Sequence, residues 1–218
     1  MNMKHFGAVA LILSFPCLAE IAATSDLPDK NPCGDLDKEQ YDGVRKDVKS
    51  VLDSKVIASI NEQIAKRLED ARKKNPKVGV AVEIVKDWKS FQKMYNDDNP
   101  KTPLSDDDAK AKFDSLDAYT YTTAKDPPSI RVVLFCNRSF KDKVIDGKAK
   151  RVLVHELVHA KLYAMLIAGV EKSKLPFQEN DDKEWKEGQD PRDRDHPGHP
   201  EDHNPDFHKE VEKLSKLL

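Results

Sequence analysis

The sequence from Arg151 to Ala168 reads RVLVHELVHAKLYAMLIA. Its apolar residues recur at intervals of one to four positions and cover one broad face of an α-helix. Such a pattern is typical of a helix in the core of a domain, so we predict a buried helix over this range. The apolar positions on which this prediction depends are Val152, Val154, Leu157, Val158, Leu162 and Leu166.

The polar residues His155, Glu156 and His159 lie within this apolar helix. Residues four apart share a helix face, so the two imidazoles can bind one metal ion while Glu156 reaches a water on that ion. Zinc brings the pKa of such a water near neutrality, and a carboxylate accepts its proton as it attacks a carbonyl carbon. The alternative is a histidine pair satisfied by ordinary hydrogen bonds in the core. We predict a Zn2+ hydrolase site with Glu156 as general base.

The chain opens with the pattern of a secretory signal peptide over Met1 to Ala19. A short basic start precedes an apolar segment from Phe6 to Leu13, and small residues follow, so we expect cleavage after Ala19 or Ala23. Two alternatives are a lipoprotein anchored at Cys17 and a cytosolic protein with a frayed N-terminal helix. No later stretch is uncharged for long enough to span a bilayer. We therefore expect a secreted protein, extracellular or periplasmic, without a membrane anchor.

Net charge and chain length limit the classes of protein to which this chain can belong. The chain has 37 basic and 39 acidic residues and a formal charge of -2, so it has no basic excess that would favour nucleic acid or an anionic membrane. The length left after the signal suits one domain. We expect a monomer with residues 20–37 as an N-terminal segment and residues 38–218 as one domain. Residues 176–202, rich in charge and proline, are predicted to be a polar insertion.

Two cysteines remain once Cys17 is removed with the signal. An even pair in an exported protein favours a disulfide, so we predict one between Cys33 and Cys136. The segment Asn31 to Asp35, NPCGD, loosely resembles the thiol-switch segment of matrix metalloproteases, which implies the alternative that Cys33 is a latency thiol.

Periodicity predicts further elements on both sides of the central helix. Asp87 and Ser105 are expected to cap short helices, and the triplet at Asn137 is a glycosylation acceptor if the source is eukaryotic. The remaining predictions are amphipathic helices within Lys38–Lys74, a surface loop over Asn96–Asp108, strands over Val78–Val85, Tyr119–Thr122 and Ile130–Cys136, and a helix end or turn over Glu171–Leu175.

A third ligand is needed, because catalytic zinc takes three protein ligands and keeps a fourth position open. His203-Asn-Pro-Asp-Phe207 precedes a C-terminal helical pattern and resembles the H-G-P-E-F segment of SprT-like minimal zinc peptidases. The resemblance implies that His203 completes the set with His155 and His159, and that Phe207 anchors the helix on the core. The other candidates are His196, His199, His208 and Glu179, the last at a thermolysin-like interval.

The resemblance also implies a fold and an activity. The expected fold is α+β and zincin-like, with a small mixed sheet packed on the active-site helix, N-terminal helices and a C-terminal helix. The expected activity is hydrolysis of peptide bonds in a protein or peptide substrate, which binds as an added strand at the sheet edge. This chain departs from the family pattern at Asn204, in its long insertion and in lacking a later zinc ribbon. The alternatives are a secreted non-catalytic zinc-binding module and hydrolysis of another amide, such as peptidoglycan.

Overall fold

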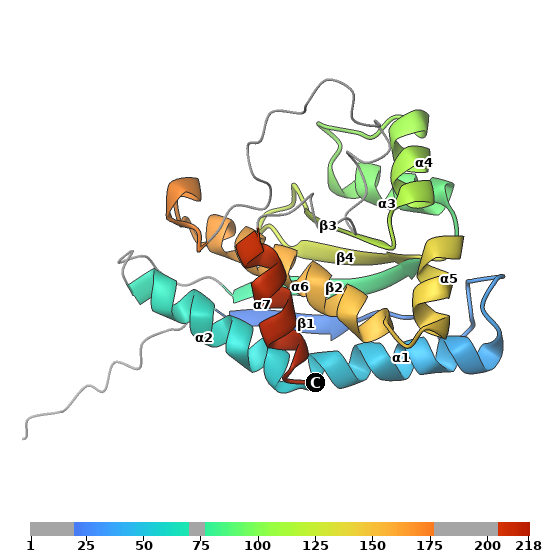
Figure 1. Cartoon of the computed structure of the whole chain (residues 1–218). Coiled ribbons are helices and arrows are strands. Elements are labelled where there is room, and N and C mark those ends of the chain that lie inside the picture. Colours follow the sequence, from blue (N-terminus) through green and yellow to red (C-terminus); the bar gives the residue numbers. More distant parts are fainter. Residues whose placement is uncertain (1–19, 70–76, 177–204) are drawn as a thin grey trace, which may run out of the picture.

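A four-stranded mixed β-sheet lies at the centre of the computed structural model, which describes residues 20–69, 77–176 and 205–218 (Figure 1). Strands β1, β2 and β4 are parallel, and β3 pairs antiparallel with β4 at one edge. The structure thus confirms a mixed α/β fold with a small mixed sheet. In spatial order the strands are β1 (Glu20–Ser25), β2 (Lys77–Val85), β4 (Ile130–Phe135) and β3 (Ala118–Thr122).

One face of the sheet is covered by the predicted central helix and by helices from both ends of the chain (Figure 1). Apolar side chains at helical spacing explain the N-terminal pair, and Asp37 and Gln40 form a capping box at the start of the first of them. The helices on this face are α1 (Lys38–Leu52), α2 (Lys55–Glu69), α5 (Arg138–Ile145), α6 (Ala149–Ile167) and α7 (Pro205–Ser215). The sequence pattern predicted α1, α2, α6 and α7, whereas α5 was not predicted.

The other face carries a smaller, aromatic core beneath α3 (Trp88–Asp98) and α4 (Asp106–Ser115). The side chains of Asp87 and Ser105 accept hydrogen bonds from backbone N–H groups in the first turns, as predicted for caps. A 3-10 turn, η1 (Lys172–Lys174), follows α6 and matches the predicted helix end.

The predicted surface loop over Asn96–Asp108 is wrong at its start, because α3 continues to Asp98. At its end, α4 begins at Asp106, directly after the predicted cap Ser105. Asp98 is only 1% exposed. Its carboxylate accepts a hydrogen bond from the Tyr121 hydroxyl and pairs with Arg131 and Lys125. These partners lie on or beside β3 and β4, so the contact that buries Asp98 could not be read from local polarity.

Asn137 is unsuited to the glycosylation that its triplet suggested. Its side chain is buried at the start of α5, where it accepts from the backbone N–H of Phe140. The same amide donates to the backbone carbonyls of Phe113 and Leu116. A glycan attached to this nitrogen would have to break these bonds and open the core.

The predicted disulfide between Cys33 and Cys136 is present, with the two Cα atoms 5.1 Å apart. It links residues 103 positions apart and joins the N-terminal segment to the residue after β4. The sulfur of Cys33 is therefore bonded to Cys136 and not available as a latency thiol. Residues 20–25 also join the sheet as β1, which local sequence did not indicate.

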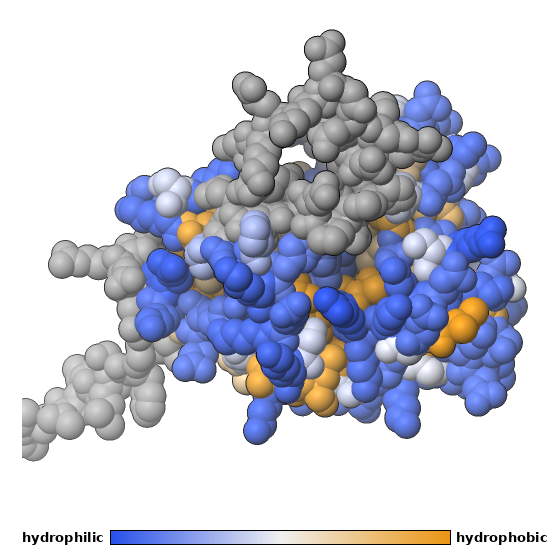
Figure 2. All heavy atoms as spheres, in the orientation of Figure 1, coloured by the Kyte–Doolittle hydropathy of each residue, from blue (hydrophilic) through white to orange (hydrophobic). Residues whose placement is uncertain are grey.

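The predicted signal peptide over Met1 to Ala19 and residues 177–202 of the predicted insertion lie outside the described residues. Within the described ranges, the helices are all too short or too polar to cross a lipid bilayer. The face shown in Figure 2 is mostly hydrophilic with small apolar areas, in keeping with 35% charged residues.

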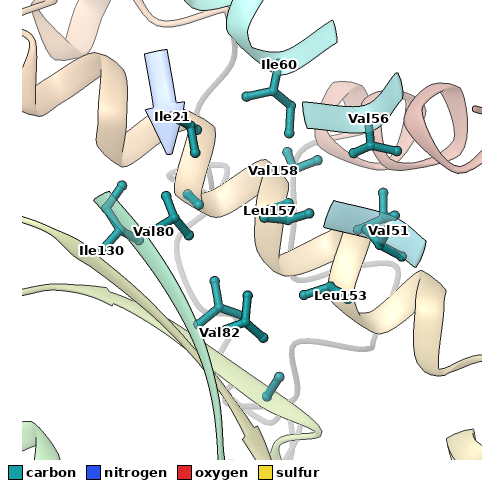
Figure 3. Close-up of a cluster of buried hydrophobic side chains, with 14 of the residues drawn as sticks. Ile21, Val51, Val56, Ile60, Val80, Val82, Ile130, Leu153, Leu157 and Val158 are labelled. Atoms are coloured by element: carbon teal, nitrogen blue, oxygen red, sulfur yellow. The ribbon is translucent and has the colours of Figure 1, made fainter. Parts of the chain in front are cut away.

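Replacing Leu157 tests how much the packing of α6 contributes to the stability of the fold. Its side chain is fully buried among residues of the sheet, α1 and α2 (Figure 3). We expect Leu157→Ala to lower the free energy of unfolding by about 2–5 kcal/mol, because the change leaves a cavity in a packed core. Urea denaturation measures this. Leu166→Ala is the matched control on the same helix, since Leu166 is 38% exposed and should cost less than about 1 kcal/mol. Equal losses for both variants would contradict the packing.

Candidate metal site

The two histidines of α6 face one another across one helical turn. Their Nε2 atoms lie 3.2 Å apart, and the rings are half-buried. An ion bound by two imidazoles at about 2.0–2.1 Å in tetrahedral geometry separates the nitrogens by about 3.3 Å. The distance also fits a hydrogen bond between a protonated and an unprotonated ring nitrogen, the alternative noted from the sequence. In either case His155 and His159 direct their outer nitrogens to one point.

Glu156 places a buried carboxylate beside this pair. It is 4% exposed, and its Oε2 accepts a hydrogen bond of 2.6 Å from the hydroxyl of Thr120 on β3. The same hydroxyl lies 3.3 Å from the backbone carbonyl oxygen of Glu156. Ligand atoms of His155, Glu156 and His159 all lie within 4.8 Å of one another. The edge strand of the sheet therefore orients the carboxylate of the predicted base.

Phe207, from the first turn of α7, forms the apolar wall of the site. Its side chain is fully buried, and its ring centroid lies 5.0 Å from that of His155 and 4.6 Å from that of His159. The predicted role of Phe207 as the anchor of the C-terminal helix is confirmed by this burial. Contact with both imidazoles further limits the orientations that the two rings can take.

The structure brings together three of the predicted site residues, His155, Glu156 and His159. His203, the predicted third ligand, lies outside the described residues, as do the competing candidates Glu179, His196 and His199. His208 is described on α7, with its ring centroid 6.1 Å from that of Phe207. Within the described part of the chain, it is not a member of the group that can share one ion.

Sequence reasoning missed Lys161, a fully buried lysine on α6. Its Nζ donates to Gln63 of α2 at 2.9 Å and to Glu210 of α7 at 3.1 Å. Burial lowers the pKa of Lys161, and the Glu210 carboxylate offsets part of that effect. For Glu210, burial raises the pKa, but Lys161 and Gln63 outweigh it and the pKa is lowered overall. The only signal in the sequence was a lysine within an apolar helical run.

Comparison of this chain with models of protein families, with curated proteins and with solved structures found no match. Two imidazoles lie within reach of one ion, a buried carboxylate stands beside them, and a phenyl ring backs both.

Thr120 provides a test of how the carboxylate is held. Thr120→Val keeps the side-chain shape but removes the donor to Glu156, so we expect a loss of about 1–3 kcal/mol in unfolding free energy. The control is Thr122→Val, two residues along the same face of β3 and more exposed. Chemical denaturation of both variants measures the difference. If Thr120→Val were no more destabilising than its control, the hydrogen bond would not be a significant support of Glu156.

Proposed function

We propose that this protein is a secreted zinc peptidase in which His155 and His159 bind zinc and Glu156 is the general base. The observation that carries the proposal is the 3.2 Å approach of the two Nε2 atoms beside a carboxylate only 4% exposed. A divalent cation held by both imidazoles would lie close to the Glu156 carboxylate, whose negative charge would favour it.

The donor set suits the proposed ion, since imidazole nitrogens are ordinary zinc ligands and a nearby carboxylate favours positive charge. Bound zinc would act as a Lewis acid that polarises a carbonyl group and makes water acidic enough to react at neutral pH. Glu156 would accept a proton from the attacking water and deliver it to the leaving amine. The bond from Thr120 holds one carboxylate oxygen, which orients the group for both transfers.

His203 is proposed as the third ligand. It precedes Pro205, the first residue of α7, by two positions, and two residues of chain reach at most about 7 Å. The first turn of α7 carries Phe207 against both imidazoles. Chain connectivity thus favours His203 over His196 and His199, which are farther from this anchor in sequence.

The substrate class is proposed from the edge strand. In the described sheet β3 pairs on one side with β4 and is the last strand of the order. An extended peptide can add to such an edge through main-chain hydrogen bonds. Thr120 of β3 touches Glu156, so a peptide added along β3 would run close to the proposed base. The zincin-like fold proposed from the sequence likewise has an edge strand that lines the cleft beside the helix carrying the two histidines.

Export is proposed from the signal pattern and is supported by the disulfide, which suits an oxidising compartment. Of the two predicted cleavage positions, the structure favours Ala19. β1 begins at Glu20 and pairs with β2 from Lys77 onward. Cleavage after Ala23 would remove four of its six paired residues, from Glu20 to Ala23.

Replacement of the base separates catalysis from metal binding. With zinc bound, Glu156→Gln should lower kcat/KM on unfolded casein by about 10²–10⁴-fold, because general-base assistance is lost. A chelator should abolish the activity of the wild type. The control is Glu212→Gln, the same change at an exposed position on α7, which should leave activity unchanged. A zinc-loaded wild type without activity on casein or on short peptides would instead support the non-catalytic zinc-binding module.

The third ligand is tested by comparing single histidine replacements. We expect His203→Ala to weaken Zn2+ binding by more than the about 10–100-fold typical of losing an outer-shell partner. His196→Ala and His199→Ala are the controls and should bind as the wild type does. Competition with a chromophoric chelator measures each affinity. If either control lost zinc while His203→Ala kept it, that residue would replace His203 as the third ligand.

A further inference from the structure

Lys161 joins three helices at a point close to the proposed metal site. Its side chain is fully buried, and Nζ donates to Gln63 on α2 and to Glu210 on α7. Lysine is almost never fully buried unless it is paired. The apolar residues of α7 that face the core, Val211 and Leu214, would hold the helix on the domain without any charged contact. The ion pair between Lys161 and Glu210 is therefore expected to do more than attach α7 to the domain.

The geometry relates this pair to the two histidines. Phe207 and Glu210 are three residues apart, so they lie on the same side of α7. Phe207 contacts the rings of His155 and His159, and Glu210 contacts Lys161, two residues beyond His159 on α6. α7 is thus attached to α6 at two points, one of which is the wall of the site.

The two attachments differ in what they specify. Apolar packing is non-directional, so by itself it defines the position of α7 along α6 less sharply than a directional contact does. A buried ion pair with a third hydrogen-bonding partner has a defined geometry, and fixing the register of one element against another is its best-attested structural use. Lys161 also donates to Gln63 on α2, so the contact positions α7 relative to both α6 and α2.

We propose that Lys161, Gln63 and Glu210 are positioning residues for the metal site. They set the position of α7 on α6, and through Phe207 they hold the rings of His155 and His159 in the orientation that binds zinc. This inference rests on the proposed function, because it assigns the residues a role in zinc binding.

The test removes the charges of Lys161 and Glu210 together, since replacing a whole ion pair with apolar residues usually preserves the fold. In Lys161→Met/Glu210→Met we expect the Zn2+ dissociation constant to rise about 10–100-fold, as for other residues that orient metal ligands. The visible absorption of the Co2+-substituted protein should also change. The control is Lys93→Met/Asp97→Met, an exposed pair on α3 with the same change in charge. It should match the wild type in both measurements.

The same double change made in a Phe207→Leu protein tests whether its effect on Zn2+ binding passes through the phenyl ring. If it does, adding the same double change to Phe207→Leu should weaken Zn2+ binding much less than it does in the wild type. Circular dichroism establishes that each variant is folded. Should the double variant fail to fold, Gln63→Met keeps Lys161 paired with Glu210 and should still weaken Zn2+ binding and alter the cobalt spectrum.

The outcomes separate this inference from the proposed function. Folded variants with the Zn2+ affinity and cobalt spectrum of the wild type would overturn the positioning role and leave the zinc site intact. If the Lys161→Met/Glu210→Met change weakened Zn2+ binding equally in the wild type and in Phe207→Leu, the effect would not pass through the Phe207 ring. A wild-type protein that binds no zinc would overturn both the positioning role and the proposed function.

Discussion

The need to compensate polar groups on a buried helix governs how this domain is assembled. α6 carries Glu156 and Lys161 into the core, and each would be strongly unfavourable there without a partner. Thr120 of β3 serves Glu156, whereas Gln63 of α2 and Glu210 of α7 serve Lys161. These partners come from three separate elements. The hydrogen bonds and the ion pair that satisfy Glu156 and Lys161 therefore also hold β3, α2 and α7 against α6.

The same constraint builds the support on which the candidate metal site lies. The sheet supplies a rigid support beneath α6, and the disulfide ties the N-terminal segment to the end of β4 on that support. His155 and His159 then project from a helix that is held on several sides, with Phe207 behind them. Ligands held by rigid elements bind metal with less reorganisation than ligands on loops. The proposed edge-strand site for substrate uses the same support.

Sequence patterns predicted most of the fold where the local signal and the tertiary environment agree. The helices over residues 38–69, strand β2 and the caps at Asp87 and Ser105 were all found as expected, because amphipathic spacing and capping chemistry act locally. Strand β1 was missed. It contains few β-branched residues and owes its conformation to pairing with β2 and to the bond from Ile21 N–H to Asn61.

The candidate site divides in the same way. His155, Glu156 and His159 could be predicted because one helical turn brings them together. Thr120 and Glu210 could not, since each meets α6 from a distant part of the chain. The burial of Asp98 and Asn137 likewise depends on partners that only the folded chain provides. Short-range chemistry is visible in a sequence, whereas the partners that orient it depend on topology.

The central claim is that one zinc ion is shared by the imidazoles of α6. X-ray absorption at the zinc edge, on protein refolded and dialysed against one equivalent of Zn2+, tests it most directly. The account predicts one tightly held ion per chain with nitrogen neighbours at about 2.0–2.1 Å, and loss of that ion in His155→Ala/His159→Ala. Zinc that is not retained, or an ion retained equally by the double variant, would contradict it.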